Sequence, residues 1–67
     1  RWTPKRIASL RHKHSLSQPI FAAFLGVSVA SVRAWEQGAK VPSGSASRLL
    51  QILAAVPNVF QQIDEAA

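Results

Sequence analysis

The apolar residues of this chain recur three and four positions apart, which is the spacing of one face of an α-helix. Serine, threonine, proline and glycine residues interrupt this pattern at short intervals and mark where helices begin and end. No stretch alternates apolar and polar residues between hairpin turns, so the pattern contains no strand signal. The pattern therefore predicts an all-α fold, a compact bundle of five short helices.

Each predicted helix starts near a residue that can cap the free N–H groups of a first turn. The first begins at Thr3 and Pro4, an N-cap and a proline at the first helical position, and ends in the basic run at 12–15. Gly26 and Gly38 suit the left-handed conformation that ends later helices. The other helices are predicted from Ser17 to Leu25, from Val29 to Gln37, from the 43–45 cluster to Val56, and from Val59 to Ile63.

The second and third predicted helices are close neighbours, because only Val27 separates Gly26 from the cap Ser28. Two helices that cross steeply over so short a turn must bury their facing apolar residues. The residues suited to this role are Phe21, Ala22, Leu25, Val27, Val32 and Trp35. The spacing predicts a helix-turn-helix whose third helix, Ser28 to Gln37 with its cap, presents an outer face to the major groove of DNA.

Length and composition favour one domain over residues 1–67, with a core at about 4–63 and a flexible C-terminal tail. The absence of cysteine excludes disulfides and thiolate metal ligands, and it fits a cytoplasmic protein. No apolar run reaches the roughly 18 residues that a bilayer requires. The chain opens at Arg1 rather than Met, from which we expect a trimmed or processed fragment.

Charge is distributed unevenly along the chain. Eight Lys and Arg residues against three acidic residues give a net charge of +5, which favours a polyanionic partner. All eight basic residues lie within 1–48, whereas 49–67 carry only Asp64 and Glu65. The N-terminal part is therefore the candidate for nucleic-acid binding. A basic surface that is merely solvated is the alternative.

A series of short motifs runs through the middle of the chain in a fixed order. They are Leu16-Ser17-Gln18, Phe21-Ala22, Leu25-Gly26-Val27-Ser28, Val32, Trp35-Glu36-Gln37-Gly38 and Pro42-Ser43-Gly44. Over about 7–53 this order resembles the helix-turn-helix domains of the XRE family, the phage Cro and repressor type, and is most similar to the HigA- and MqsA-type antitoxins. The resemblance implies a lambda-repressor-like bundle and sequence-specific binding to double-stranded DNA.

For function, the resemblance implies transcriptional regulation by an antitoxin that represses its own toxin–antitoxin operon. The partners would be a palindromic operator and a cognate toxin, and the protein would work at the nucleoid in the cytoplasm of a bacterium or phage host. The residues implied to contact DNA phosphates are Gln18, Ser28, Ser31, Lys40 and Ser43. Arg11 and Glu36 match a pair that forms a structural salt bridge in this family.

The positions that read bases in this family depart from the usual pattern. They correspond to Val29, Ala30 and Ala34, which can touch thymine methyl groups but cannot form bidentate hydrogen bonds. Arg33 is then the one long donor on the predicted third helix. A phosphate contact or a solvated charge is the alternative role for Arg33. Base specificity would be modest and shared with DNA shape.

The C-terminal apolar residues predict a homodimer interface. They are Val56, Val59, Phe60 and Ile63. Dimerisation would place two third helices about 34 Å apart, one turn of DNA, and so suit a palindrome. The alternative is that these residues fold back on Leu53 and Trp35. For Ile20 and Phe24, partial burial and an exposed apolar patch both remain open.

Other functions find little support. The acidic residues are scattered, and neither a thiol, a Gly-rich phosphate loop nor a metalloprotease motif occurs, so we expect no enzyme and no cofactor. His12 and His14 are two apart and point to different sides of a helix, which argues against a metal site. A protein-interaction module with weak or no DNA binding is the second hypothesis. Binding to a membrane surface is disfavoured because the basic first helix also supplies Ile7 and Leu10 to the core.

Overall fold

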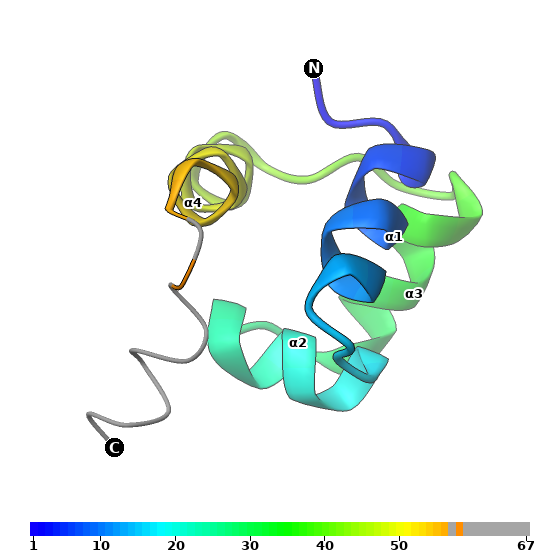
Figure 1. Ribbon diagram of the computed structural model, residues 1–67. Coiled ribbons are helices and arrows are strands. Elements are labelled where there is room, and N and C mark those ends of the chain that lie inside the picture. Colours follow the sequence, from blue (N-terminus) through cyan, green and yellow to red (C-terminus); the bar gives the residue numbers. More distant parts are fainter. Residues whose placement is uncertain (57, 59–67) are drawn as a thin grey trace.

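Four α-helices make up the part of the chain that the computed structural model describes, residues 1–56 and 58 (Figure 1). They are α1 (Pro4–Lys13), α2 (Gln18–Leu25), α3 (Val29–Gln37) and α4 (Gly44–Ala55). No strand occurs within these described residues, so the predicted all-helical fold is confirmed. The predicted fifth helix, Val59 to Ile63, lies outside them.

The four helices begin where local capping chemistry predicts. Each N-cap side chain accepts a hydrogen bond from the backbone N–H three residues later, and the four caps are Thr3, Ser17, Ser28 and Ser43. Helix α2 ends at Gly26 with φ 70° and α3 ends at Gly38 with φ 78°, the left-handed conformation that glycine adopts without steric cost. After α1 the chain turns through Ser15, which has φ 56° despite its side chain.

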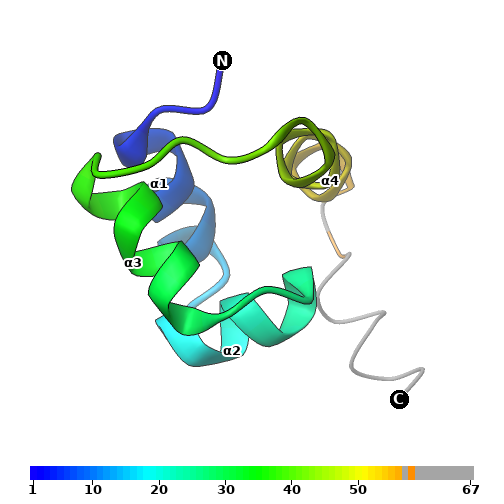
Figure 2. The same cartoon turned by 180° about the vertical axis from the view of Figure 1, so that it is seen from behind.

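Helices α2 and α3 each pack against two of the other helices. Helix α3 packs against both α1 and α2, and α2 also contacts α4. Figures 1 and 2 show α1 and α3 together on one side of the molecule and α4 on the other, with residues 38–43 crossing between them past the beginning of α1. At this crossing Gly38 lies next to Pro4, because a Cβ added to the glycine would be 3.6 Å from Cγ of Pro4.

One apolar core joins all four helices. Its buried residues are Ile7, Leu10, Phe21, Ala22, Leu25, Val32, Trp35, Leu50 and Leu53. Four of them, Ile7, Phe21, Val32 and Leu50, have no exposed surface. Helix α4 and its C-cap are less buried than their apolar sequence suggests, since Ile52 remains 48% exposed and Val56 36% exposed.

No helix in residues 1–56 and 58 combines the length and the apolar character needed to cross a membrane.

Candidate nucleic-acid interface

The turn between α2 and α3 holds these two helices close together. The N–H of Val27 donates to the carbonyl of Ala22 at 3.0 Å, and the N–H of Gly26 donates to that of Ala23 at 3.2 Å. Ala22 is buried beside this turn, where a larger side chain would force the helices apart. These two hydrogen bonds end α2, and α3 begins directly after the turn with Ser28 as its N-cap.

Burial along α3 separates an inner face from an outer face. Val32 and Trp35 are buried and attach the helix to the core. Of the predicted DNA contacts on α3 and its N-cap, three are half-buried, namely Val29, Ser31 and Ala34. The other three, Ser28, Ala30 and Arg33, are exposed. Of the predicted base-contacting residues, Arg33 thus combines exposure with a long donor side chain.

Gln37 also belongs to the outer face of α3 and was not among the predicted site residues. It is exposed and follows Arg33 by four positions, so the two side chains lie on the same side of the helix. A glutamine amide can hydrogen-bond to adenine in the major groove, as an arginine can to guanine. The i, i+4 spacing from Arg33 is the sequence signal that could have identified it.

The start of α3 carries a pair of hydroxyl groups. The Oγ of Ser28 accepts from the N–H of Ser31 at 3.1 Å and lies 3.0 Å from the Oγ of Ser31. Both predicted phosphate contacts therefore sit on the first turn of α3, where the positive end of the helix dipole favours an anion.

The other predicted phosphate contacts, Lys40 and Ser43, lie beyond the opposite end of α3. Both are exposed. The Oγ of Ser43 accepts from the N–H of Ala46 at 3.2 Å and caps α4. A nine-residue helix is about 13 Å long, so the two sets of predicted contacts frame α3 at its two ends.

An ion pair connects α1 to α3 at the edge of the core. The Nε of Arg11 is 2.8 Å from Oε2 of Glu36, and its Nη2 donates to Oε1 at 2.8 Å. The Nη1 of Arg11 also donates to the carbonyl of Leu16 at 3.0 Å. The side chains of Arg11 and Glu36 are only 14% and 9% exposed. The structure thus brings together the two residues that the resemblance pairs.

Gln18 joins this cluster from the first turn of α2. Its Nε2 donates to Oε1 of Glu36 at 3.3 Å, a contact that the sequence analysis did not anticipate. An amide nitrogen carries two hydrogens, so the bond leaves Gln18 a second donor for a phosphate. Gln18 can therefore hold the internal ion pair and still offer a donor at its predicted phosphate contact.

The surrounding donors shift the pKa of Glu36. Its hydrogen bonds with Arg11 lower this pKa most, burial opposes them, and the hydrogen bond from Gln18 lowers it further. The same contact with Glu36 raises the pKa of Arg11. Glu36 is the one acidic residue among 1–56 and 58. Because Arg11 compensates its charge, the basic residues around α3 face no other carboxylate within that part of the chain.

The structure describes only some of the residues predicted for the dimer interface and the apolar patch. Val56 follows the last turn of α4 and is 36% exposed, whereas Val59, Phe60 and Ile63 lie outside the described residues. Ile20 is 51% exposed, while Phe24 packs against the core. Over 1–56 and 58, no group of three His, Cys, Asp or Glu side chains could hold a metal ion.

Comparison with known proteins relates the chain to antitoxins. No protein-family model matches it. It is 35% identical over 63 residues to "Antitoxin HigA-2" of Vibrio cholerae serotype O1. The match covers 94% of this chain and 61% of the relative, so the chain spans about three fifths of that protein's length. The predicted relationship to the HigA-type antitoxins is therefore confirmed for the part that this chain represents, and its helical fold is consistent with an XRE-type helix-turn-helix domain.

Proposed function

We propose that this chain is the DNA-binding domain of an antitoxin and that it regulates transcription, repressing its own toxin–antitoxin operon. The observation that carries the proposal is the outer face of α3, where exposed Arg33 and Gln37 extend from a helix held by buried Val32 and Trp35. The net charge of +5 and the likeness to a HigA antitoxin support the same function.

In this mechanism α3 enters the major groove and the flanking residues hold it in register. Ser28 and Ser31 at the start of α3, Gln18 on α2, and Lys40 with Ser43 after α3 contact backbone phosphates. Arg33 and Gln37 contact base edges, while Val29, Ala30 and Ala34 touch thymine methyl groups. Specificity is modest because apolar contacts discriminate bases less than paired hydrogen bonds do.

The larger assembly belongs to the same proposal. Residues 1–67 form one lambda-repressor-like domain, and two copies bind a palindromic operator through an interface that includes Val56 and the residues after it. A cognate toxin is the protein partner, by analogy with the antitoxin that the chain resembles. The cytoplasm, at the nucleoid, is the expected location.

Selection of duplexes from a random DNA pool tests the proposal. We expect enrichment of a palindrome whose half-sites are about one helical turn apart. Contacts with six phosphates would make the affinity fall about a thousandfold between 50 and 200 mM salt. Failure to bind any duplex at 50 mM salt would refute the proposal.

A second function, a protein-interaction module that retains the fold, is favoured by one observation. Three of the predicted base-contacting positions on α3, Val29, Ala30 and Ala34, are apolar, and Ala30 is exposed. If this function is correct, purified toxin should bind the domain and Ala30→Asp should abolish that binding, while no duplex is selected. Selection of a palindrome would exclude it as the main role.

A further inference from the structure

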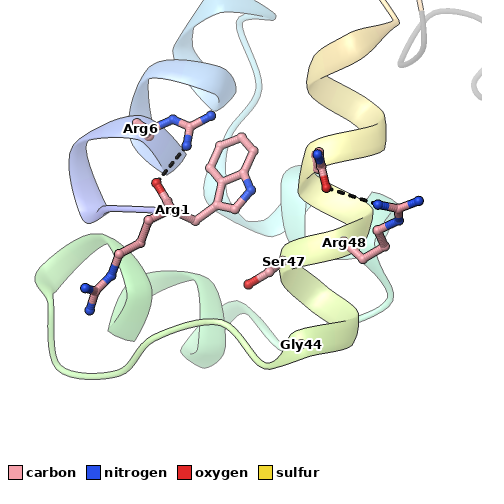
Figure 3. Close-up of a pocket in the computed structure, with 7 residues that line it drawn as sticks. Arg1, Arg6, Gly44, Ser47 and Arg48 are labelled. Carbon is pink, nitrogen blue, oxygen red and sulfur yellow. Dashed lines mark hydrogen bonds between the residues drawn. The ribbon is translucent and has the colours of Figure 1, made fainter.

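A hollow of about 460 Å³ lies outside the helix-turn-helix, between the beginning of α1 and the first half of α4 (Figure 3). It is lined by Arg1, Trp2, Arg6, Gly44, Ser47, Arg48 and Gln51. None of these residues is among the predicted DNA contacts. The volume exceeds that of one small ion and can admit a phosphate with the groups attached to it.

The lining carries three guanidinium groups and no carboxylate. Arg1, Arg6 and Arg48 come from two separate parts of the chain and line one hollow. In Figure 3 the guanidinium group of Arg6 lies beside the Trp2 ring, whereas those of Arg1 and Arg48 extend toward the outside of the hollow. Within 1–56 and 58 the single acidic residue, Glu36, is occupied by Arg11 on another part of the surface. Like charges gathered in this way repel one another, and an anion between them removes that repulsion.

Two of these guanidinium groups are held in position before any ligand arrives. Arg6 lies over the ring of Trp2, 4.2 Å from the ring centroid, and its Nη1 donates to the carbonyl of Arg1 at 2.7 Å. The Nη1 of Arg48 donates to Oε1 of Gln51 at 3.4 Å. Each contact leaves further N–H donors on the planar guanidinium, which matches the geometry of phosphate oxygens.

The hollow is continuous with the predicted phosphate-binding loop. Residues 38–43, which carry Lys40 and Ser43, run along its edge and end at Gly44 in its lining (Figure 3). A DNA strand that contacts Lys40 and Ser43 can therefore continue toward Arg48 and Arg6. An acidic protein could bind the hollow without contacting this loop. The position of the hollow beside the loop therefore favours the DNA backbone as its ligand.

We propose that this arginine hollow binds a phosphodiester of the DNA backbone next to the segment that α3 reads. The inference rests on the proposed DNA-binding function and adds an anchoring site to it. Arg6 donates to the phosphate, Arg48 at the rim adds positive charge, and Trp2 supplies an apolar wall against which the sugar packs. The site contributes affinity without base specificity.

Salt dependence of duplex binding tests the proposal. The double variant Arg6→Gln/Arg48→Gln is compared with Lys5→Gln/Lys13→Gln, which removes the same charge from exposed α1 residues outside the hollow. Each lost phosphate contact lowers the slope of log K against log salt by about 0.9. Because the hollow holds one phosphate, we expect a loss of about 0.9 in slope for the arginine variant alone, so that its affinity falls roughly three- to fourfold less than that of the wild type between 50 and 200 mM salt.

Further measurements keep the outcomes distinct. Equal slopes for the two double variants would overturn the proposal while leaving DNA binding itself intact, whereas a wild type that binds no duplex would refute the proposed function. Weaker binding of a polyglutamate peptide by the arginine variant, with its DNA slope unchanged, would assign the hollow to an acidic protein partner instead. If loss of the Arg6–Trp2 contact unfolds the double variant, Arg48→Gln and the charge-retaining Arg48→Lys take its place. Of these two variants, only Arg48→Gln should then show a smaller slope of log K against log salt.

Discussion

Among single residues, Glu36 links three helices through one carboxylate. It accepts two hydrogen bonds from Arg11 on α1 and one from Gln18 on α2, while itself belonging to α3. A partly buried arginine without its partner would retain a charge that the surroundings no longer compensate. Stability should therefore depend on the protonation of this one group.

We expect Glu36→Gln to lower the free energy of unfolding by about 1–3 kcal/mol at neutral pH, because glutamine cannot neutralise Arg11. The pKa of Glu36 is lowered in the folded protein. Its contribution is therefore present above the ordinary glutamate pKa of about 4.3 and is lost as the pH falls through the folded value. Urea unfolding of both proteins at pH 7 and pH 3 should show the difference shrinking in acid. A difference that is the same at both pH values would contradict this, and Lys5→Gln serves as the exposed control.

Arg33 is the residue whose substitution separates base reading from phosphate binding. We expect Arg33→Ala to lose about 1–3 kcal/mol of discrimination at one base pair of the selected operator. Lys40→Ala should weaken all operator variants alike and lower the salt slope by about 1. Competition binding across single-base operator variants measures both. A uniform loss for Arg33→Ala would place its side chain on a phosphate.

At the scale of elements, the helix boundaries follow from interactions that are local in sequence. Each N-cap side chain and the backbone N–H that donates to it are three residues apart, and the glycines at 26 and 38 end helices through their own backbone conformation. Such boundaries can be predicted without knowledge of the fold. The end of α1 at Lys13 also falls in the predicted run at 12–15, but the left-handed turn after it could not be predicted, because Ser15 adopts φ 56° where glycine would be expected.

Two glycine substitutions should act in opposite directions. A Cβ at Gly26 would meet nothing within 4 Å, yet φ of 70° makes alanine unfavourable there, and we expect Gly26→Ala to destabilise the protein by about 1–2 kcal/mol. Gly44 also has open space, but it sits in helical conformation at the start of α4, so Gly44→Ala should stabilise by up to about 1 kcal/mol. Thermal unfolding monitored by circular dichroism measures both. If both substitutions raised the stability of the protein, or both lowered it, the argument from backbone conformation would be wrong.

For the whole molecule, exposed apolar residues on α2 and α4 pose the question of what covers them. Ile20 is 51% exposed and Ile52 48% exposed. Val56 is the C-cap of α4 and precedes the other predicted dimer residues in the sequence. Burial of such residues between two copies would remove apolar surface from water and supply stability that a domain of this size otherwise lacks.

Sedimentation equilibrium tests the homodimer. We expect the wild type to approach twice the chain mass of 7.3 kDa with rising concentration, and Val56→Asp to remain at the chain mass. An aspartate in an apolar interface would lose water without gaining a partner. Val41→Asp is the matched control, because Val41 is 72% exposed and lies in the loop before the start of α4, at the opposite end of that helix from Val56. A wild type that stays at 7.3 kDa at high concentration would contradict dimerisation.

The four described helices, most of the core and the likeness to antitoxin domains can be predicted from sequence alone, because caps, glycine conformation and helical spacing act within a few residues. The exposure of apolar residues on α4, the hydrogen bond from Gln18 to Glu36 and the hollow that Arg6 and Arg48 share are visible only in the folded chain. These depend on helix packing between residues up to 42 positions apart in the sequence. The major-groove helix was thus predictable from local pattern, whereas the arginine hollow exists only because α1 and α4 meet.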